Sequence, residues 1–176
     1  MATAKGQCTF CDIIRGAAEV SICYEDATAI AFLDIQPVHT GHTLVVPRAH
    51  YESLLDLPHD LAMHLFEVAM VLEPIIRRVS GAEGMNMVVS SGAAAGQDVF
   101  HYHVHLIPRS AKDGFDIPLP FPGSPMPDRT QLDATAARVI AALRDPMKKA
   151  GSGDLGLGTG ERDSRRPEGG KAKPRQ

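Results

Sequence analysis

The sequence predicts an α+β fold built on an antiparallel sheet. Two strand-like runs come first and are joined by a short turn, which is the pattern of a hairpin. One amphipathic helix follows, and further strand-like runs come after it, so helices and strands do not alternate as they do in a parallel sheet. With 176 residues and 44% hydrophobic content, the chain can bury one core, and we expect a single domain.

The first third of the chain predicts one short helix and three strands. Residues 9–14 predict a helical turn, with Thr9 and Asp12 spaced as a capping box and Gly16 as the stop signal. Runs of apolar, β-branched and aromatic residues predict the strands, which cover residues 20–24, 28–33 and 43–46.

A long helix is predicted over residues 60–80, where leucine, isoleucine and valine recur at steps of three and four. Gly81 ends this pattern, and Pro74 is expected to kink or interrupt the helix. A fourth strand is predicted over residues 85–90, and a Gly-Ala loop over residues 92–96 leads out of it.

A second helix is predicted to begin near Thr130, with Asp133 in the place of a capping partner. Its apolar residues are expected to be buried, namely Leu132, Val139, Ile140 and Leu143. Residues 147–176 combine glycine, serine and charge without any aromatic residue. We therefore expect a domain over residues 1–146 and a disordered basic tail behind it.

The most informative stretch is residues 101–107, where histidine alternates with apolar residues. In an extended strand, successive side chains point to opposite faces, so His101, His103 and His105 would share one face. From these residues alone, two interpretations stay open. The histidines either have a structural role, in which each needs a hydrogen-bond partner, or they bind a catalytic metal, because histidines two apart on a strand make good zinc ligands.

Several blocks of residues surround this stretch in a fixed order. They are Phe10-Cys11-Asp12-Ile13-Ile14, Tyr24-Glu25-Asp26, Ala31-Phe32-Leu33-Asp34-Ile35, Gly41-His42-Thr43-Leu44-Val45-Val46-Pro47, His50 and the run from Gly96 to Arg109. Over about residues 8–112 the chain resembles the histidine triad (HIT) family of nucleotide hydrolases and transferases, in particular its zinc-containing bacterial members. The resemblance implies a HIT-like fold with a five-stranded antiparallel sheet, one long helix, a short N-terminal helix and assembly into a homodimer.

The resemblance implies a nucleotidyl hydrolase or phosphoramidase that cleaves purine nucleoside monophosphate esters, anhydrides or phosphoramidates. It places the nucleophile at His103, which would form a covalent nucleotidyl-histidine that water then cleaves. It places His105 and His42 beside the phosphate, where they donate hydrogen bonds and protonate the leaving group. Gln97 precedes the histidines, where its amide could hydrogen-bond a phosphoryl or leaving-group atom; its alternative interpretation is a solvated loop residue.

The resemblance also assigns contacts to the nucleoside. It makes Asp34 the acceptor for the ribose hydroxyls, whereas a carboxylate there could by itself cap the turn around Pro37. Four apolar side chains would line the base pocket, although each taken singly predicts a core residue: Phe10, Ile13, Phe32 and Ile35.

Two positions depart from the family pattern. Asp98 stands where the family usually has serine or threonine, and an ionised carboxylate can only accept hydrogen bonds, so we expect Asp98 to narrow substrate choice or slow turnover. Ser90 stands where the family often has asparagine near the sugar or phosphate. Two other functions therefore stay open: a nucleotide-binding regulatory module with little or no catalysis, and a metal-dependent hydrolase with His103 and His105 as ligands.

Cys8 and Cys11 have the two-residue spacing of a metal knuckle or of a redox pair. The resemblance favours zinc and supplies His50 and His101 as the other two ligands. Two thiolates and two imidazoles would close a tetrahedral structural site with one zinc per chain.

Charge and hydropathy bound the partners and the location. The net charge is -3, and residues 147–176 hold eight basic against four acidic side chains, so the predicted domain is acidic, which argues against a nucleic-acid partner. No run of 18 apolar residues predicts a membrane span. The start of the chain has no apolar stretch like that of a secretory signal, and the odd count of three cysteines suits a reducing compartment, so we expect a cytoplasmic location.

Overall fold

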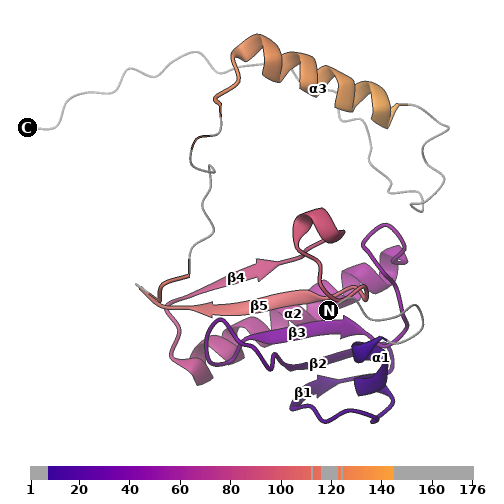
Figure 1. The fold of residues 1–176 in the computed structure, drawn as a ribbon, viewed down its shortest axis with the longest axis vertical. Helices are drawn as coiled ribbons and strands as arrows, with labels where there is room; N and C mark the ends of the chain where they lie inside the picture. Colours follow the sequence, from indigo (N-terminus) through magenta and orange to yellow (C-terminus); the bar gives the residue numbers. More distant parts are fainter. Residues whose placement is uncertain (1–7, 112, 116–122, 124, 145–176) are drawn as a thin grey trace, which may run out of the picture.

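The computed structural model describes residues 8–111, 113–115, 123 and 125–144. Its body is an antiparallel five-stranded sheet with one long helix packed on one face (Figure 1). The strands lie in the order β1-β2-β3-β5-β4 and are β1 Ile22–Glu25, β2 Ala29–Leu33, β3 Thr43–Pro47, β4 Gly84–Val88 and β5 Val104–Arg109. The helices are α1 Thr9–Ile14, α2 His59–Ser80, the 3-10 turn η1 Ala93–Ala95 and α3 Arg129–Leu143. The predicted fold class, with five antiparallel strands, one long helix and a short N-terminal helix, is confirmed.

Both faces of the central strands are buried, because side chains alternate along each strand. On β2, Ala29 and Ala31 belong to the cluster under α2, and their small side chains let the helix approach the sheet. Ile30 and Phe32 belong to a second cluster on the opposite face, where α1 contributes Phe10. Each fully buried isoleucine or phenylalanine side chain stabilises the fold by about 1.5–3 kcal/mol. The sheet centre, where β3 and β5 lie side by side, is therefore held from both sides.

Helix α2 runs continuously through Pro74, so this proline does not interrupt the helix, and the alternative expectation of a kink stays a prediction. Pro74 lies on the exposed side of the helix, where water can satisfy the Met70 carbonyl that loses its amide partner. The predicted end of the helix is confirmed, since Gly81 adopts a left-handed φ of 70° and its amide donates to the Arg77 carbonyl. Not every predicted apolar position is buried, because Ile75 and Val79 face outward.

The other two helices begin at caps that differ from the predicted ones. Helix α1 begins after Cys8 with no side-chain cap, so Thr9 and Asp12 form no capping box. Helix α3 begins after Asp128, whose side chain exchanges hydrogen bonds with Gln131 in a capping box, rather than near Thr130 with Asp133.

The predicted burial of the α3 side chains is wrong within this single chain. Every residue of the helix is exposed, and Figure 1 shows α3 standing apart from the sheet. An amphipathic pattern predicts that a face will be covered, but it does not say which surface covers it. The predicted tail over residues 147–176 lies outside the described residues.

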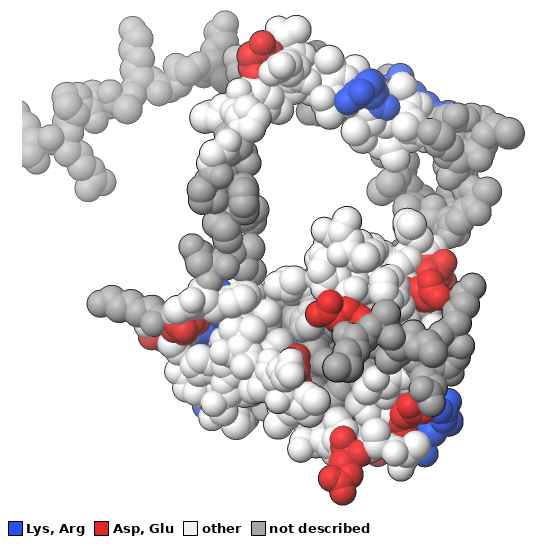
Figure 2. All heavy atoms as spheres, in the orientation of Figure 1, with Lys and Arg blue, Asp and Glu red and all other residues white. Residues whose placement is uncertain are grey.

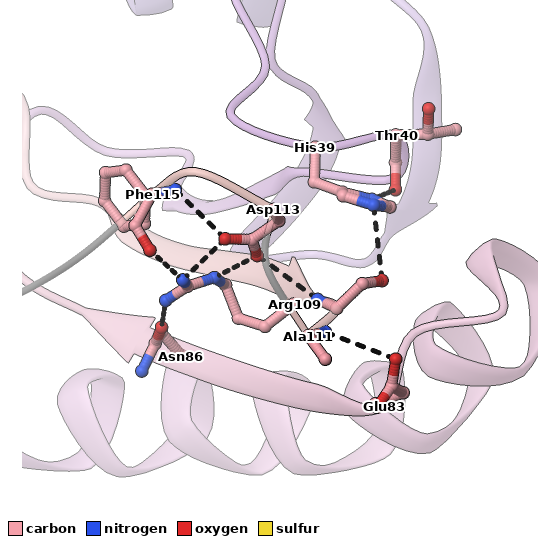
Figure 3. Close-up of polar contacts among 9 residues, drawn as sticks. His39, Thr40, Glu83, Asn86, Arg109, Ala111, Asp113 and Phe115 are labelled. Carbon is pink, nitrogen blue, oxygen red and sulfur yellow. Dashed lines mark hydrogen bonds and ion pairs between the residues drawn. The ribbon is translucent and has the colours of Figure 1, made fainter.

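Arg109, at the end of β5, anchors the chain that leaves the sheet (Figure 3). Its Nε and Nη2 atoms donate to the two carboxylate oxygens of Asp113 at 2.7 and 2.9 Å, and it also donates to the Asn86 side chain on β4. The guanidinium contacts Phe115 twice, through the carbonyl and with its carbon 4.8 Å from the ring centroid. One side chain therefore fixes Asp113 and Phe115 against the end of the sheet.

The surface of the described residues agrees with the acidic balance of the sequence. On the face drawn in Figure 2, basic side chains are few and separated, and acidic side chains are scattered among uncharged ones. Within the described part of the chain, no helix has both the length and the apolar character that a membrane span requires.

Candidate active site and metal cluster

His101 and His103 lie where the chain enters β5, and only His105 lies on that strand. β5 begins only at Val104, so the predicted extension of a regular strand back to His101 is wrong. The Tyr102 amide instead donates to the Tyr51 carbonyl at 2.6 Å, a contact outside the sheet ladder. The predicted alternation still holds, because Tyr102 and the strand residues after it that share its face are buried under α2. His101 and His103 do not face solvent, since they are 0% and 6% exposed, and His105 is half-buried.

The main chain fixes the tautomer of His103. Its Nδ1 lies 2.7 Å from the His101 carbonyl, which can only accept, so Nδ1 carries the proton and Nε2 keeps a lone pair. Burial lowers the pKa of His103, although the His101 hydrogen bond and the charges of Asp34 and Asp98 oppose this shift. The ring is therefore neutral near pH 7 and has one nitrogen available as a nucleophile.

His42 and His105 form a hydrogen-bonded pair beside that nucleophile. His42 Nε2 lies 3.0 Å from His105 Nδ1, and the rings of His103 and His105 have centroids 4.7 Å apart. The Val38 amide donates to His42 Nδ1 at 3.3 Å, which makes His42 Nε2 the donor to His105 and leaves the His105 Nε2 proton free for a ligand. Burial lowers the pKa of His42 and, with the neighbouring His103 and His42 rings, lowers that of His105 to about 4.

The Gln97 side chain is occupied by the main chain. Its Oε1 accepts from the Gly92 amide at 2.7 Å, and its Nε2 donates to the carbonyls of Glu52 at 2.7 Å and Val99 at 3.1 Å. Gln97 is also buried, at 4% exposure. The amide therefore fastens the loop before His103 to the segment around residue 52, and its predicted contact with a phosphate stays a prediction.

Asp34 lies at the end of β2 beside the histidine pair. One of its oxygens accepts from the Gln36 amide at 2.8 Å, as a turn cap does, and the other lies 3.6 Å from His42 Nδ1. The carboxylate also borders a hollow of about 610 Å³. The hollow is lined by Glu19, Val20, Ser21, Leu33, Asp34 and Ile35.

The predicted base-pocket residues divide between this hollow and the core. Ile35 lines the hollow and is exposed, whereas Phe32 is buried in the cluster below α1. Phe10 is buried as well, and its ring meets the His103 ring edge-on with centroids 5.2 Å apart. Ile13 packs at the edge of the same cluster. Ser90 is half-buried and Asp98 is exposed, close enough for its charge to act on the His103 pKa.

The four predicted metal ligands come together from three separate segments of the chain. Cys8 Sγ lies 3.4 Å from His101 Nδ1, and Cys11 Sγ lies 3.4 Å from His50 Nδ1 and 3.6 Å from His101 Nδ1. Tetrahedral zinc with bonds of about 2.3 Å to sulfur and 2.0–2.1 Å to nitrogen separates such donors by about 3.6 Å. The donor set and its spacing therefore fit zinc.

The surroundings of this cluster also suit a cation. His101 Nε2 donates to the Pro47 carbonyl at 2.8 Å, which leaves Nδ1 unprotonated toward the sulfur atoms. Burial lowers the pKa of His101 to about 4, so the ring is neutral, as a metal ligand must be. Burial and the neighbouring Cys8 raise the pKa of the Cys11 thiol, and a bound cation would offset this.

Several backbone groups that orient the site could not be predicted from the sequence. The Tyr51 carbonyl holds the chain at Tyr102, where it enters β5. The Pro47 carbonyl orients the His101 ring, and the Val38 amide orients the His42 ring. A peptide group has the same donor and acceptor whatever its side chain, so no residue pattern marks these contacts.

Known proteins are similar to this chain in sequence and fold. The chain matches the family model of the HIT domain over residues 15–112. Protein hit of Bacillus subtilis is 43% identical over 109 residues, which cover 61% of this chain and 75% of that protein. Adenylylsulfatase HINT3 of Arabidopsis thaliana is 36% identical over 111 residues; the match covers 63% of this chain and 56% of that protein, so the chain spans little more than half its length. The crystal structure of a zinc-bound histidine triad family protein from Mycobacterium smegmatis is 34% identical, with a TM-score of 0.59 over 77% of this chain and 96% of that one.

Proposed function

The chain belongs to the HIT domain family, and from this membership we propose that it is a nucleotide-binding hydrolase or transferase. Its substrates are purine nucleoside monophosphates that carry a leaving group in an ester, anhydride or phosphoramidate bond. The observation that carries the proposal is the hydrogen bond from His103 Nδ1 to the His101 carbonyl, which leaves Nε2 as a neutral nucleophile. The relative from Arabidopsis, an adenylylsulfatase by name, acts on a substrate of the same general kind.

In the first half of the proposed reaction, His103 Nε2 attacks the α-phosphorus and the bond to the leaving group breaks. The negative charge of the bound phosphate favours protonation of the His42–His105 pair beside it. The pair gives that extra proton to the departing atom, so a poor leaving group such as an amine departs in neutral form. The product of this half is a nucleotidyl group bonded to His103.

In the second half, water attacks the same phosphorus from the side that the leaving group has vacated. The water proton passes to the His42–His105 pair, and the electron pair of the P–N bond returns to His103 Nε2. Splitting one displacement into two in this way suits histidine, which attacks phosphorus well and departs well. Asp34 holds the ribose hydroxyls and keeps the nucleotide in line, while Gln97 fastens the loop that enters the site.

Zinc bound by Cys8, Cys11, His50 and His101 has a structural role in this proposal. It would hold the N-terminal helix against the residues that enter β5, next to His103. A closed set of four protein ligands leaves no open position for substrate, so the cation takes no part in the reaction. The zinc-bound relative from Mycobacterium smegmatis supports zinc in this branch of the family.

We also propose that two copies of the chain form a homodimer. Helix α2 carries exposed apolar side chains on the side away from the sheet, among them Met63, Phe66 and Met70. β4 is an edge strand of the sheet. An apolar helix face and an unpaired edge beside each other are liabilities in a monomer, and a second copy would cover both.

The stereochemistry at phosphorus tests the proposed reaction. A substrate made chiral at the α-phosphorus with sulfur and oxygen isotopes should give product with retained configuration, because two in-line displacements each invert it. Direct attack by water would invert the configuration once and would contradict the His103 intermediate. Binding of AMP without turnover of phosphoramidates, anhydrides or esters would favour the regulatory module instead.

A further inference from the structure

A second group of metal-ligand side chains lies outside the cysteine cluster. One ligand atom each from Asp34, His42 and His105 lies within 4.8 Å of the other two. The two ring nitrogens that face each other, His42 Nε2 and His105 Nδ1, are 3.0 Å apart. On a tetrahedral zinc with bonds of about 2.0–2.1 Å, two such nitrogens would be about 3.3 Å apart. A small opening of this pair would therefore admit a metal ion.

The possible ligand atoms of this group are held in place and are not all taken up by strong hydrogen bonds. The His42–His105 hydrogen bond uses one proton between two nitrogens, and a cation could take its place once that proton has moved to His42 Nδ1. The Val38 amide, which donates to Nδ1 at 3.3 Å, would then give way to the proton. Asp34 gives one oxygen to the Gln36 amide, and its second oxygen has only the looser contact of 3.6 Å with His42 Nδ1.

We propose that Asp34, His42 and His105 form a second metal site, which takes Zn²⁺ or a similar divalent transition ion and so inhibits the enzyme. Two imidazoles and one carboxylate are a ligand set that borderline transition ions prefer over Mg²⁺ or Ca²⁺. Three protein ligands leave at least one position for water or a ligand oxygen. Asp34 itself borders the hollow.

The ion would act through the protons of the site. Binding to the facing nitrogens moves the His42 proton from Nε2 to Nδ1, and the ion then prevents the pair from carrying the extra proton that a leaving group needs. The inhibition rests on the proposed function, whereas the binding itself does not. Because protons and metal compete for the same nitrogens, the inhibition should weaken as the pH falls.

Zinc stoichiometry tests the binding. The full chain is dialysed to equilibrium against buffered free zinc, and bound zinc is measured by atomic emission. We expect two zinc ions per wild-type chain at high free zinc, and one in each of the variants Asp34→Asn and His105→Asn. Asp98→Asn, which removes a nearby carboxylate outside the group, should keep two. Circular dichroism of each zinc-loaded variant shows whether the fold is retained.

Inhibition is measured on the same samples. Added zinc should suppress turnover of the one-zinc wild-type enzyme, and loss of the Asp34 carboxylate should raise the required zinc concentration at least about tenfold. The binding proposal is overturned if wild type saturates at one zinc, or if both folded variants still take up two. Unchanged or increased turnover with two zinc ions bound would overturn the inhibition. If the enzyme turns over no substrate at all, the proposed function fails, and the stoichiometry still decides whether the second site exists.

Discussion

The Gln97 amide offers a prediction whose size follows from its contacts. Gln97→Met keeps the length of the side chain and removes three hydrogen bonds, with lengths of 2.7, 2.7 and 3.1 Å. Each such bond stabilises a fold by about 0.5–1.5 kcal/mol net, so the loss of three should cost the variant about 1.5–4.5 kcal/mol. For a domain of this size that loss lowers the unfolding temperature by roughly 10 °C.

A second substitution tests the donor end of the Gln97 amide separately from its acceptor end. Gln97→Glu keeps an acceptor for the Gly92 amide but directs a carboxylate oxygen at the carbonyls of Glu52 and Val99. We expect this variant to be less stable at pH 7 than at pH 4–5, where a protonated carboxyl can donate again.

The assay is thermal unfolding of the zinc-loaded proteins, followed by circular dichroism. Asp98→Asn serves as the control, because a change at this exposed neighbour should alter stability by no more than about 0.5 kcal/mol. If Gln97→Met unfolds at the wild-type temperature, the amide does not fasten the loop, and the argument from its hydrogen bonds is refuted.

Three further predictions concern a hydrogen bond, the zinc and the assembly. His64 donates to Asp26 at 2.7 Å, and this bond raises the His64 pKa. The stability that the bond adds is therefore complete below pH 6.5, which is about the pKa of histidine in the unfolded chain. It is lost as the pH rises through the His64 pKa of the folded protein. The urea concentrations at which wild type and His64→Gln half-unfold should converge at a pH above the folded His64 pKa. A difference that stays the same at every pH would contradict this. Cys11→Ser should lose the structural zinc and unfold at a lower temperature, whereas Cys23→Ser should keep it; equal zinc contents would contradict the assigned ligands. Met70→Lys should make the protein monomeric in sedimentation, and a dimer that survives would exclude this face of α2.

The sequence predicted the sheet well, because its strands follow the patterns that burial imposes. On β2 both faces are covered, and all five residues of the run Ala29–Leu33 are accordingly apolar. One long helix between the first three strands and the last two indicated the antiparallel class. Gly81 marked the end of that helix, as the structure shows. These features depend on local periodicity, which a single sequence contains.

The site could be predicted only in part. Residue types and spacing singled out the three alternating histidines and the pair of cysteines. The role of His103, and the choice of His50 and His101 as partners of the cysteines, came only through the resemblance to a family. The tautomers of His42 and His103 depend on the Val38 amide and the His101 carbonyl, and the course of the chain at Tyr102 depends on the Tyr51 carbonyl. Such backbone contacts depend on the folded path of the chain, which no side-chain pattern records. The predicted burial of α3 was wrong for a related reason, because an amphipathic pattern does not identify the surface that will cover the helix.

The most direct test of the nucleophile is mass spectrometry of enzyme quenched in acid-free buffer during turnover of adenosine phosphoramidate. We predict one adenylyl group per chain at early times, located on the peptide that contains His103 and missing from a folded His103→Asn variant, whose turnover should fall at least about a thousandfold. An adduct on another residue, or full turnover by His103→Asn, would contradict the account.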